Sequence, residues 1–138
     1  MSFKFSSKIV WNGNKVKVQG EKIHYKSVFE AGVSIQGQAV ALAPRDTSRL
    51  AGSIIVKTKD DENLNRFSGN AKTEDIISNP IEENVAHVGT NLSYSVYQEF
   101  GTRKMIAQPF LRPAFDLAQG KTLSIFEKNG KLYLGDYL

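Results

Sequence analysis

The segment from Tyr94 to Phe115, YSVYQEFGTRKMIAQPFLRPAF, constrains the fold more than any other part of the chain. Tyr94, Tyr97 and Phe100 fall three residues apart, so a helix would place their side chains along one apolar stripe. Gly101 follows at once, and a residue in the left-handed region commonly ends a helix at such a position. The pattern therefore predicts a short helix that ends at Gly101.

Two prolines divide the second half of this signature segment. After a polar, basic loop at residues 102–108, Pro109 and Pro113 bracket the stretch Phe110-Leu111-Arg112. Because proline disfavours helix at its own position and at the residue before it, we expect this bracketed stretch to be extended or in a turn. Pro113 suits the first position of a following helix, where its missing N–H would have no partner.

The order of these residues resembles that of a known family. Y-x-x-Y-Q-E-F-G-T at residues 94–102, followed by Q-P-F-L-R-P-A-F at residues 108–115, resembles the signature of the head–tail joining proteins of long-tailed bacteriophages. These proteins are also called neck, tail-completion or minor tail proteins. Residues 43–54 resemble a second motif of that family, A-P-x-x-T-G-x-L-x-x-S-I, with Ser48 where the family usually has Gly.

The resemblance implies a place in the virus particle. It implies a ring of about six copies at the head–tail interface, made in the cytoplasm of the host bacterium by a lytic phage or a prophage. The partners would be further copies of the chain, portal or connector proteins, tail-tube or tail-terminator proteins and, without sequence readout, the packaged DNA. The residues expected at the assembly interface are those of the signature segment: Tyr94, Tyr97, Glu99, Phe100, Gly101, Thr102, Pro109, Phe110, Leu111, Arg112 and Pro113.

We expect the whole chain, residues 1–138, to form one α+β domain. Its antiparallel sheet would carry a long amphipathic helix, an extended hairpin with a flexible tip and shorter C-terminal helices. Residues 1–20 predict a basic β-hairpin, because apolar and polar residues alternate on both sides of the turn sequence Asn12-Gly13-Asn14. Residues 21–43 predict the main helix from apolar residues at three- and four-residue spacing, with Gly32 suited to close packing.

Residues 53–90 predict the extended hairpin. The β-branched run SIIVKT at residues 53–58 predicts its first strand, and residues 81–88 predict the second. Residues 59–80 between them are polar and of mixed charge, so we expect a long loop at the tip.

The last part of the chain, residues 91–138, predicts the signature helix and one further helix. Asn91 or Ser93 could cap the signature helix. The second helix is expected to run from Pro113 to about Gly120, or on to Lys128, with Asn129-Gly130 as its end. The apolar tail beyond Gly130 would then pair as a strand.

The net charge of +4 is distributed unevenly along the chain. Lys4, Lys8, Lys15 and Lys17 all lie in the predicted N-terminal hairpin. They could form a solvated outer face, or they could face a DNA channel and add an attraction that depends on salt and not on base sequence. An alternative function is therefore a small basic nucleic-acid-binding or regulatory module.

Little in the sequence indicates catalysis. The chain has no Cys and two isolated His, and it carries no motif of nucleotide, zinc or nucleophilic-serine chemistry. Glu99 is the one acidic residue of the signature segment, and we expect it to cap backbone N–H groups of the following loop or to pair with Arg103 or Arg112. A hydrolase that used Glu99 would need a concave pocket around it.

These observations predict a protein without catalytic residues, metal or cofactor. No apolar run approaches the roughly 20 residues of a membrane span, and the first residues do not resemble a signal peptide, so we expect no membrane partner.

Overall fold

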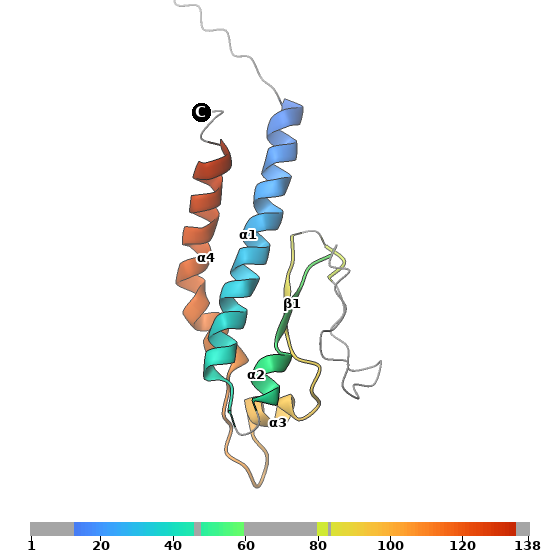
Figure 1. Cartoon of the computed structure of the whole chain (residues 1–138), viewed down its shortest axis with the longest axis vertical. Helices are drawn as coiled ribbons and strands as arrows, with labels where there is room; N and C mark the ends of the chain where they lie inside the picture. Colours follow the sequence, from blue (N-terminus) through green and yellow to red (C-terminus); the bar gives the residue numbers. More distant parts are fainter. Residues whose placement is uncertain (1–12, 46–47, 60–79, 83, 135–138) are drawn as a thin grey trace, which may run out of the picture.

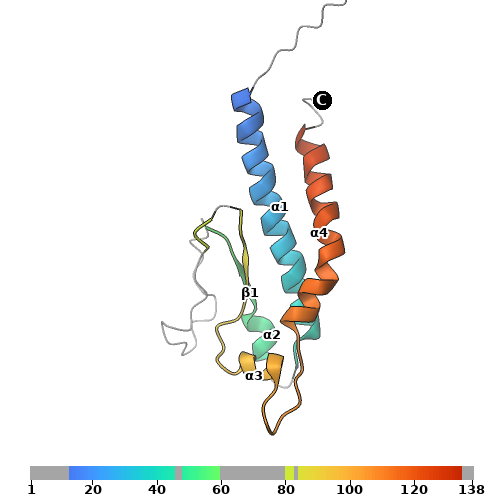
Figure 2. The same cartoon turned by 180° about the vertical axis from the view of Figure 1, so that it is seen from behind.

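The computed structural model describes residues 13–45, 48–59, 80–82 and 84–134 (Figure 1). Its elements in chain order are the helices and strands α1 (Gly13–Leu42), α2 (Arg49–Ser53), β1 (Ile55–Lys57), β2 (His87–Gly89), α3 (Ser95–Phe100) and α4 (Leu111–Leu134). In both views α1 lies in the middle, with α4 antiparallel to it on one side and the two strands on the other (Figures 1 and 2). The α+β class is therefore confirmed in outline, with a sheet of two antiparallel strands within the described ranges.

Helix α1 begins at Gly13, so the second arm of the predicted N-terminal hairpin is wrong. Val16 and Val18 alternate as in a strand, but Gly20, Ile23 and Ser27 continue at three- and four-residue spacing. Ile23 and Ser27 are buried, and α1 packs along its length against α4. This long-range packing favours the helical period over a local alternation of two valines. The first arm of the hairpin, with Lys4 and Lys8, lies outside the described residues.

Strands β1 and β2 pair antiparallel, with Val56 opposite Val88 in the centre of the register. The two antiparallel strands of the predicted hairpin are thus confirmed in outline, but β1 is shorter than residues 53–58, and β2 overlaps the predicted residues 81–88 only at positions 87 and 88. Most of the hairpin tip lies outside the described residues. Ser53 belongs to α2 and not to the strand, and its hydroxyl donates to the carbonyl of Leu50 at 2.7 Å.

Gly32 allows the strands to approach α1 closely. A Cβ atom at this position would lie 2.7 Å from Cγ1 of Val56 and 3.4 Å from Cβ of Ala86. Such a distance to Val56 is shorter than real Cβ contacts, so any larger residue would require a shift of the strand or its side chains. The expectation that small residues on the main helix serve close packing is confirmed at Gly32.

The apolar core lies where the end of α1, α2 and the start of α4 meet. Its buried members are Ala39, Ala43, Leu50, Ile54, Phe110 and Ala114. Phe110 is the largest fully buried side chain among the described residues, with 0% exposure. The core therefore depends on an aromatic residue from the signature segment.

Helix α4 continues to Leu134, so the predicted end at Asn129-Gly130 is wrong, as is a strand at residues 131–134. Asn129 is fully buried against α1, where its amide donates to Oγ of Ser27 at 3.1 Å and to Oε2 of Glu30 at 3.2 Å. These bonds and the packing of α4 on α1 outweigh the local preference of Asn-Gly for a turn. One helix of 24 residues thus replaces the shorter helix that the sequence predicted after Pro113. None of the described helices combines the length and the apolar character that crossing a bilayer requires.

Candidate functional site

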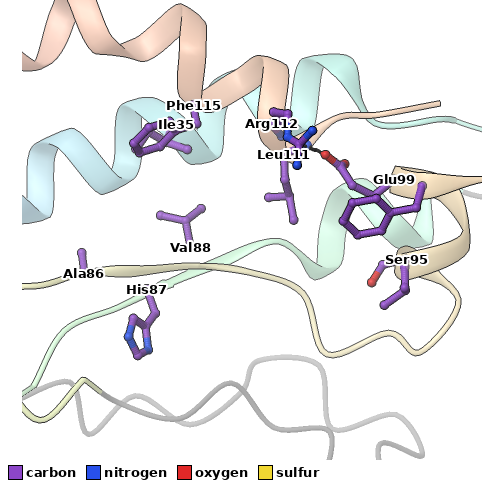
Figure 3. Close-up of a pocket in the computed structure, with 11 residues that line it drawn as sticks. Ile35, Ala86, His87, Val88, Ser95, Glu99, Leu111, Arg112 and Phe115 are labelled. Carbon is purple, nitrogen blue, oxygen red and sulfur yellow. Dashed lines mark hydrogen bonds between the residues drawn. The ribbon is translucent and has the colours of Figure 1, made fainter. Parts of the chain in front are cut away.

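An apolar groove runs between α4 and strand β2, with α1 as its floor. Figure 3 shows the part of it that lies nearest α3. It consists of two adjoining pockets of about 630 and 320 Å³, which share Ile35, Ala86, Val88 and Phe115 as lining residues. The groove reaches from α3 at one end to Phe126 of α4 at the other. We refer to this feature below as the apolar groove.

Helical spacing on α3 and α4 produces the walls of the apolar groove. Val96 and Phe100 stand four residues apart on α3, and Phe115 and Leu123 lie on α4. These side chains remain substantially exposed, with Phe100 at 67% and Leu123 at 71%. A single copy of the chain therefore leaves large apolar side chains in contact with water along the groove.

Glu99 links the two halves of the signature segment through hydrogen bonds. Its carboxylate accepts the backbone N–H groups of Phe110 at 2.8 Å, of Leu111 at 3.0 Å and of Arg112 at 3.0 Å. These are three of the N–H groups that the first turn of a helix leaves without an intrahelical partner, and Pro113 has no N–H. Glu99 and Pro113 together thus account for every free donor at the start of α4.

The position of the carboxylate affects its acidity. Partial burial raises the pKa of Glu99. The three backbone hydrogen bonds and the nearby Arg112 guanidinium together lower the pKa by more than burial raises it, so the pKa lies below the ordinary value of 4.5. The group is therefore ionised at neutral pH, and the negative charge lies at the positive end of the α4 macrodipole.

The loop between α3 and α4 has a defined geometry. Gly101 has a φ of 74°, and a Cβ atom there would lie 2.8 Å from the backbone nitrogen of Ala107. Thr102 and Met105 exchange two backbone hydrogen bonds, and the N–H of Gln108 donates to the carbonyl of Gln98 at 2.7 Å. The loop therefore returns the chain to α3 before α4 begins.

The structure separates the predicted interface residues into three groups by their burial. Tyr97, Phe100, Thr102, Pro109 and Arg112 lie on the surface. Phe110 lies in the core of the subunit itself, so its side chain is not part of the surface that a single copy presents. The remaining residues, Tyr94, Glu99, Gly101, Leu111 and Pro113, are half-buried between these two groups.

Two local predictions in this segment also need correction. Leu111 and Arg112 are the first residues of α4 and not an extended stretch, because Glu99 satisfies their N–H groups and lets the helix begin before Pro113. Helix α3 has Tyr94 at its N-cap without a side-chain hydrogen bond, so neither Asn91 nor Ser93 caps it.

Sequence reasoning did not identify most of the groove. The spacing of Phe115, Thr122 and Phe126 along α4 was a usable signal, since residues three, four and seven apart share one helix face. The contribution of Ala86 and Val88 had no local signal, because it depends on where the strands cross α1.

The predicted basic residues are Lys4, Lys8, Lys15 and Lys17. Lys15 and Lys17 are exposed on α1, and Lys4 and Lys8 lie outside the described residues. Within the described part of the chain, no three His, Asp or Glu residues are placed to hold a metal ion.

Comparison with known proteins identifies the family but no individual relative. No curated protein and no solved structure shows significant similarity to the chain. The sequence profile described as bacteriophage HK97-gp10, putative tail-component, matches residues 8–101, which include every element from α1 to α3. Helix α4 and the second half of the signature segment lie beyond the match. The resemblance to phage head–tail proteins is thereby confirmed, and the chain belongs to the HK97-gp10-like family of putative phage tail components.

Proposed function

We propose that this family member is a structural protein of the virion that forms a ring at the head–tail interface and joins the tail to the portal complex. The ring would contain about six copies, in contact with portal or connector proteins on one side and tail-tube or tail-terminator proteins on the other. The observation that carries the proposal is the apolar groove, which a single copy leaves open to water.

The exposed residues of the groove would contribute part of the free energy that holds an interface together. Val96, Phe100, Phe115 and Leu123 are each more than half exposed. Full burial of a large apolar side chain contributes roughly 1.5–3 kcal/mol, so covering the remaining half of these four would contribute about 4 kcal/mol. Monomeric proteins rarely expose contiguous apolar surface of this kind unless a partner covers it.

The geometry of Glu99 supports a role without catalysis. Glu99 lines the apolar groove, which is the concave pocket that a hydrolase would need. Its two carboxylate oxygens, however, accept three backbone N–H groups from the start of α4. A carboxylate engaged in this way is a poor general base, because taking up a proton would break those bonds.

The experiment is the assembly of particles with the wild-type protein and with the variant Phe100→Asp. The variant places a charge in the proposed interface, so we expect filled heads and finished tails that stay separate in electron micrographs. Leu117→Asp is a matched control, because Leu117 is 58% exposed on α4 but does not line the groove. Joined particles in normal numbers with Phe100→Asp would refute the role of the groove.

A second function has independent support from the ends of α1 and α4. The start of α1 and the end of α4 lie at the same end of the molecule (Figure 1). The start of α1 carries Lys15, Lys17 and Lys22, the end of α4 carries Lys128 and Lys131, and all five residues are exposed. Clustered lysines attract the phosphate backbone of DNA without reading its sequence.

The test of this second function is binding of the wild-type protein to duplex DNA over a range of salt concentrations. Replacing Lys15, Lys17, Lys128 and Lys131 with Ser should reduce the slope of log affinity against log salt by about 0.9 for each phosphate that the variant no longer neutralises. An unchanged slope would exclude DNA binding by this end of the protein.

A further inference from the structure

Helix α1 has a second apolar face, on the side opposite the apolar groove. Ala31 and Ile35 line the groove. Residues two apart in a helix point about 200° apart, so Phe29 and Val33 point away from the groove. Val18, Phe29 and Val33 are 49%, 41% and 43% exposed. The same helix therefore presents apolar side chains on two opposite sides.

This second face carries a lysine among its apolar residues. Val18, Lys22, Phe29 and Val33 follow one another at spacings of four, seven and four residues, so they share one face of α1. We refer to these four residues as the outer stripe. None of them lines the groove, and Lys22 is exposed.

The outer stripe and the groove have the same length. From Val18 to Val33 the helix rises by roughly 23 Å at about 1.5 Å per residue. The wall of the groove on α4 extends from Leu111 to Phe126, which is the same number of residues and again roughly 23 Å. A helix laid along the groove could therefore place the whole stripe against it.

Acidic residues flank the groove on its α4 side. Asp116 and Glu127 directly follow the lining residues Phe115 and Phe126, and both are exposed. Together with Leu123 they are spaced seven and four residues apart, so all three share one face of α4 beside the groove. An apolar stripe with a lysine thus has a counterpart in an apolar groove with an acidic rim, and opposite charges favour the contact of two such surfaces.

The charges also select one direction of packing. Lys22 lies in the first third of α1 and Glu127 in the last third of α4, and these parts of the two helices lie towards the same end of the molecule (Figure 1). Arg112 lines the groove at its other end. A neighbour with α1 parallel brings its Lys22 towards Glu127, whereas an antiparallel neighbour brings Lys22 towards Arg112. Like charges in contact disfavour the antiparallel arrangement.

We propose that the outer stripe of one copy packs into the apolar groove of a second copy, with α1 of the two copies parallel. The two surfaces lie on opposite sides of each copy, so the contact is heterologous and repeats from copy to copy until a ring closes. This inference rests on the proposed function, because it names the contact that would hold the ring together.

The first test is chemical crosslinking, which is site-specific because the chain has no Cys. A tagged Val33→Cys variant and an untagged Leu123→Cys variant are mixed and treated with a short bifunctional maleimide. We expect pairs of one tagged and one untagged chain, and at least about tenfold fewer when Leu117→Cys, exposed on α4 outside the groove, replaces Leu123→Cys. Equal yields with both acceptors would overturn the proposal, as would a product that joins only two tagged chains.

The second test measures the dissociation constant of the oligomer by native mass spectrometry and light scattering. Lys22→Glu should raise this constant about tenfold because it would face Glu127 of the neighbour, and adding Glu127→Lys to the same chain should restore it to within about threefold. Lys17→Glu is the matched control, since Lys17 is exposed on α1 outside the outer stripe, and it should leave the constant unchanged. Tighter assembly of Lys22→Glu would overturn the parallel contact, as would a double variant that assembles no better than the single one.

The third test separates this contact from the ring itself. Replacing Phe29 and Val33 with Ser should raise the dissociation constant at least about 30-fold. The melting temperature of the variant is measured alongside, to show that the fold is retained. An unchanged dissociation constant overturns the contact between stripe and groove and leaves the ring standing. A wild-type protein that stays monomeric at every concentration overturns the ring, and the contact with it.

Discussion

The capping of α4 by Glu99 gives the most specific prediction of the structure. Replacing Glu99 with Ala removes the acceptor of three backbone N–H groups at Phe110, Leu111 and Arg112. It also removes a negative charge from the N-terminus of a helix of 24 residues. The change leaves the sequence of α4 itself unaltered.

The magnitude follows from the separate contributions. Loss of a helix N-cap costs about 0.5–2 kcal/mol, and loss of a favourable charge at the helix N-terminus costs a further 0.3–1 kcal/mol or so. Phe110 is buried, so its N–H loses its partner without full access to water, which costs about 1 kcal/mol or more. We therefore expect Glu99→Ala to lower the free energy of unfolding by about 2–4 kcal/mol, or roughly 6–16 °C in melting temperature.

The assay is urea denaturation combined with hydrogen exchange. Protection of the amides of Phe110 and Leu111 should fall with Glu99→Ala, and Glu99→Gln, which keeps one acceptor oxygen, should lie between the variant and the wild type. Glu127→Gln is the control, since Glu127 is an exposed residue of α4 away from its N-terminus, and it should change stability by less than about 0.5 kcal/mol. A loss below 0.5 kcal/mol or so with Glu99→Ala would refute the capping role.

The same residue predicts a pH dependence. The pKa of Glu99 is lower in the folded protein than its ordinary value of 4.5, so its contribution to stability is complete above about pH 4.5 and is lost as the pH falls through the folded pKa. The wild type should therefore lose more stability than Glu99→Gln when the pH falls below about 4.5. Parallel losses in the two proteins would contradict the ionised cap.

Three further predictions concern packing, each measured by denaturant unfolding. Gly32→Ala should destabilise the protein by about 1–3 kcal/mol because its Cβ would lie 2.7 Å from Cγ1 of Val56. Gly37→Ala, whose Cβ would have no atom within 4 Å, should instead stabilise the protein by about 0.5–1 kcal/mol. A Gly32→Ala variant that is more stable than Gly37→Ala would contradict the close approach of the strands to α1. Phe110→Ala should cost about 3–5 kcal/mol, and a cost below about 1 kcal/mol would contradict its place in the core. Asn129→Ala should cost about 1–3 kcal/mol because two hydrogen bonds disappear, and no cost would show that these bonds do not stabilise the fold.

Features whose cause is local could be predicted from the sequence. The helix that ends at Gly101 and the capping by Glu99 were both expected, because glycine has a positive φ at little cost and a lone carboxylate near free N–H groups is a strong acceptor. Pro113 was expected at the first position of the helix but is the third residue of α4, still within the first turn, where its missing N–H needs no partner. Each of these features depends on residues fewer than 15 positions apart.

Features whose cause lies far along the chain were missed. Val16 and Val18 alternate as in a strand but are helical in the structure, because α4, about 100 residues later in the chain, packs on α1. The Asn129-Gly130 sequence, which favours a turn, lies inside α4 because the side-chain amide of Asn129 donates hydrogen bonds to Ser27 and Glu30 of α1. Phe110 resembled an exposed anchor, but α1 and α2 enclose it. Local preferences of about 1 kcal/mol cannot compete with such packing.

The buried amide of Asn129 has a consequence for the outline of the groove. If α4 slid along α1 by one turn, about 5.4 Å, the amide would face aliphatic side chains and have neither acceptor, at a cost of about 1–3 kcal/mol. A seam made only of aliphatic residues would tolerate several such alignments. Because α4 has one register along α1, Phe115 and Phe126 of α4 keep fixed positions along the groove relative to Val28 and Ile35 of α1. The apolar groove therefore has a defined shape within a single copy of the chain.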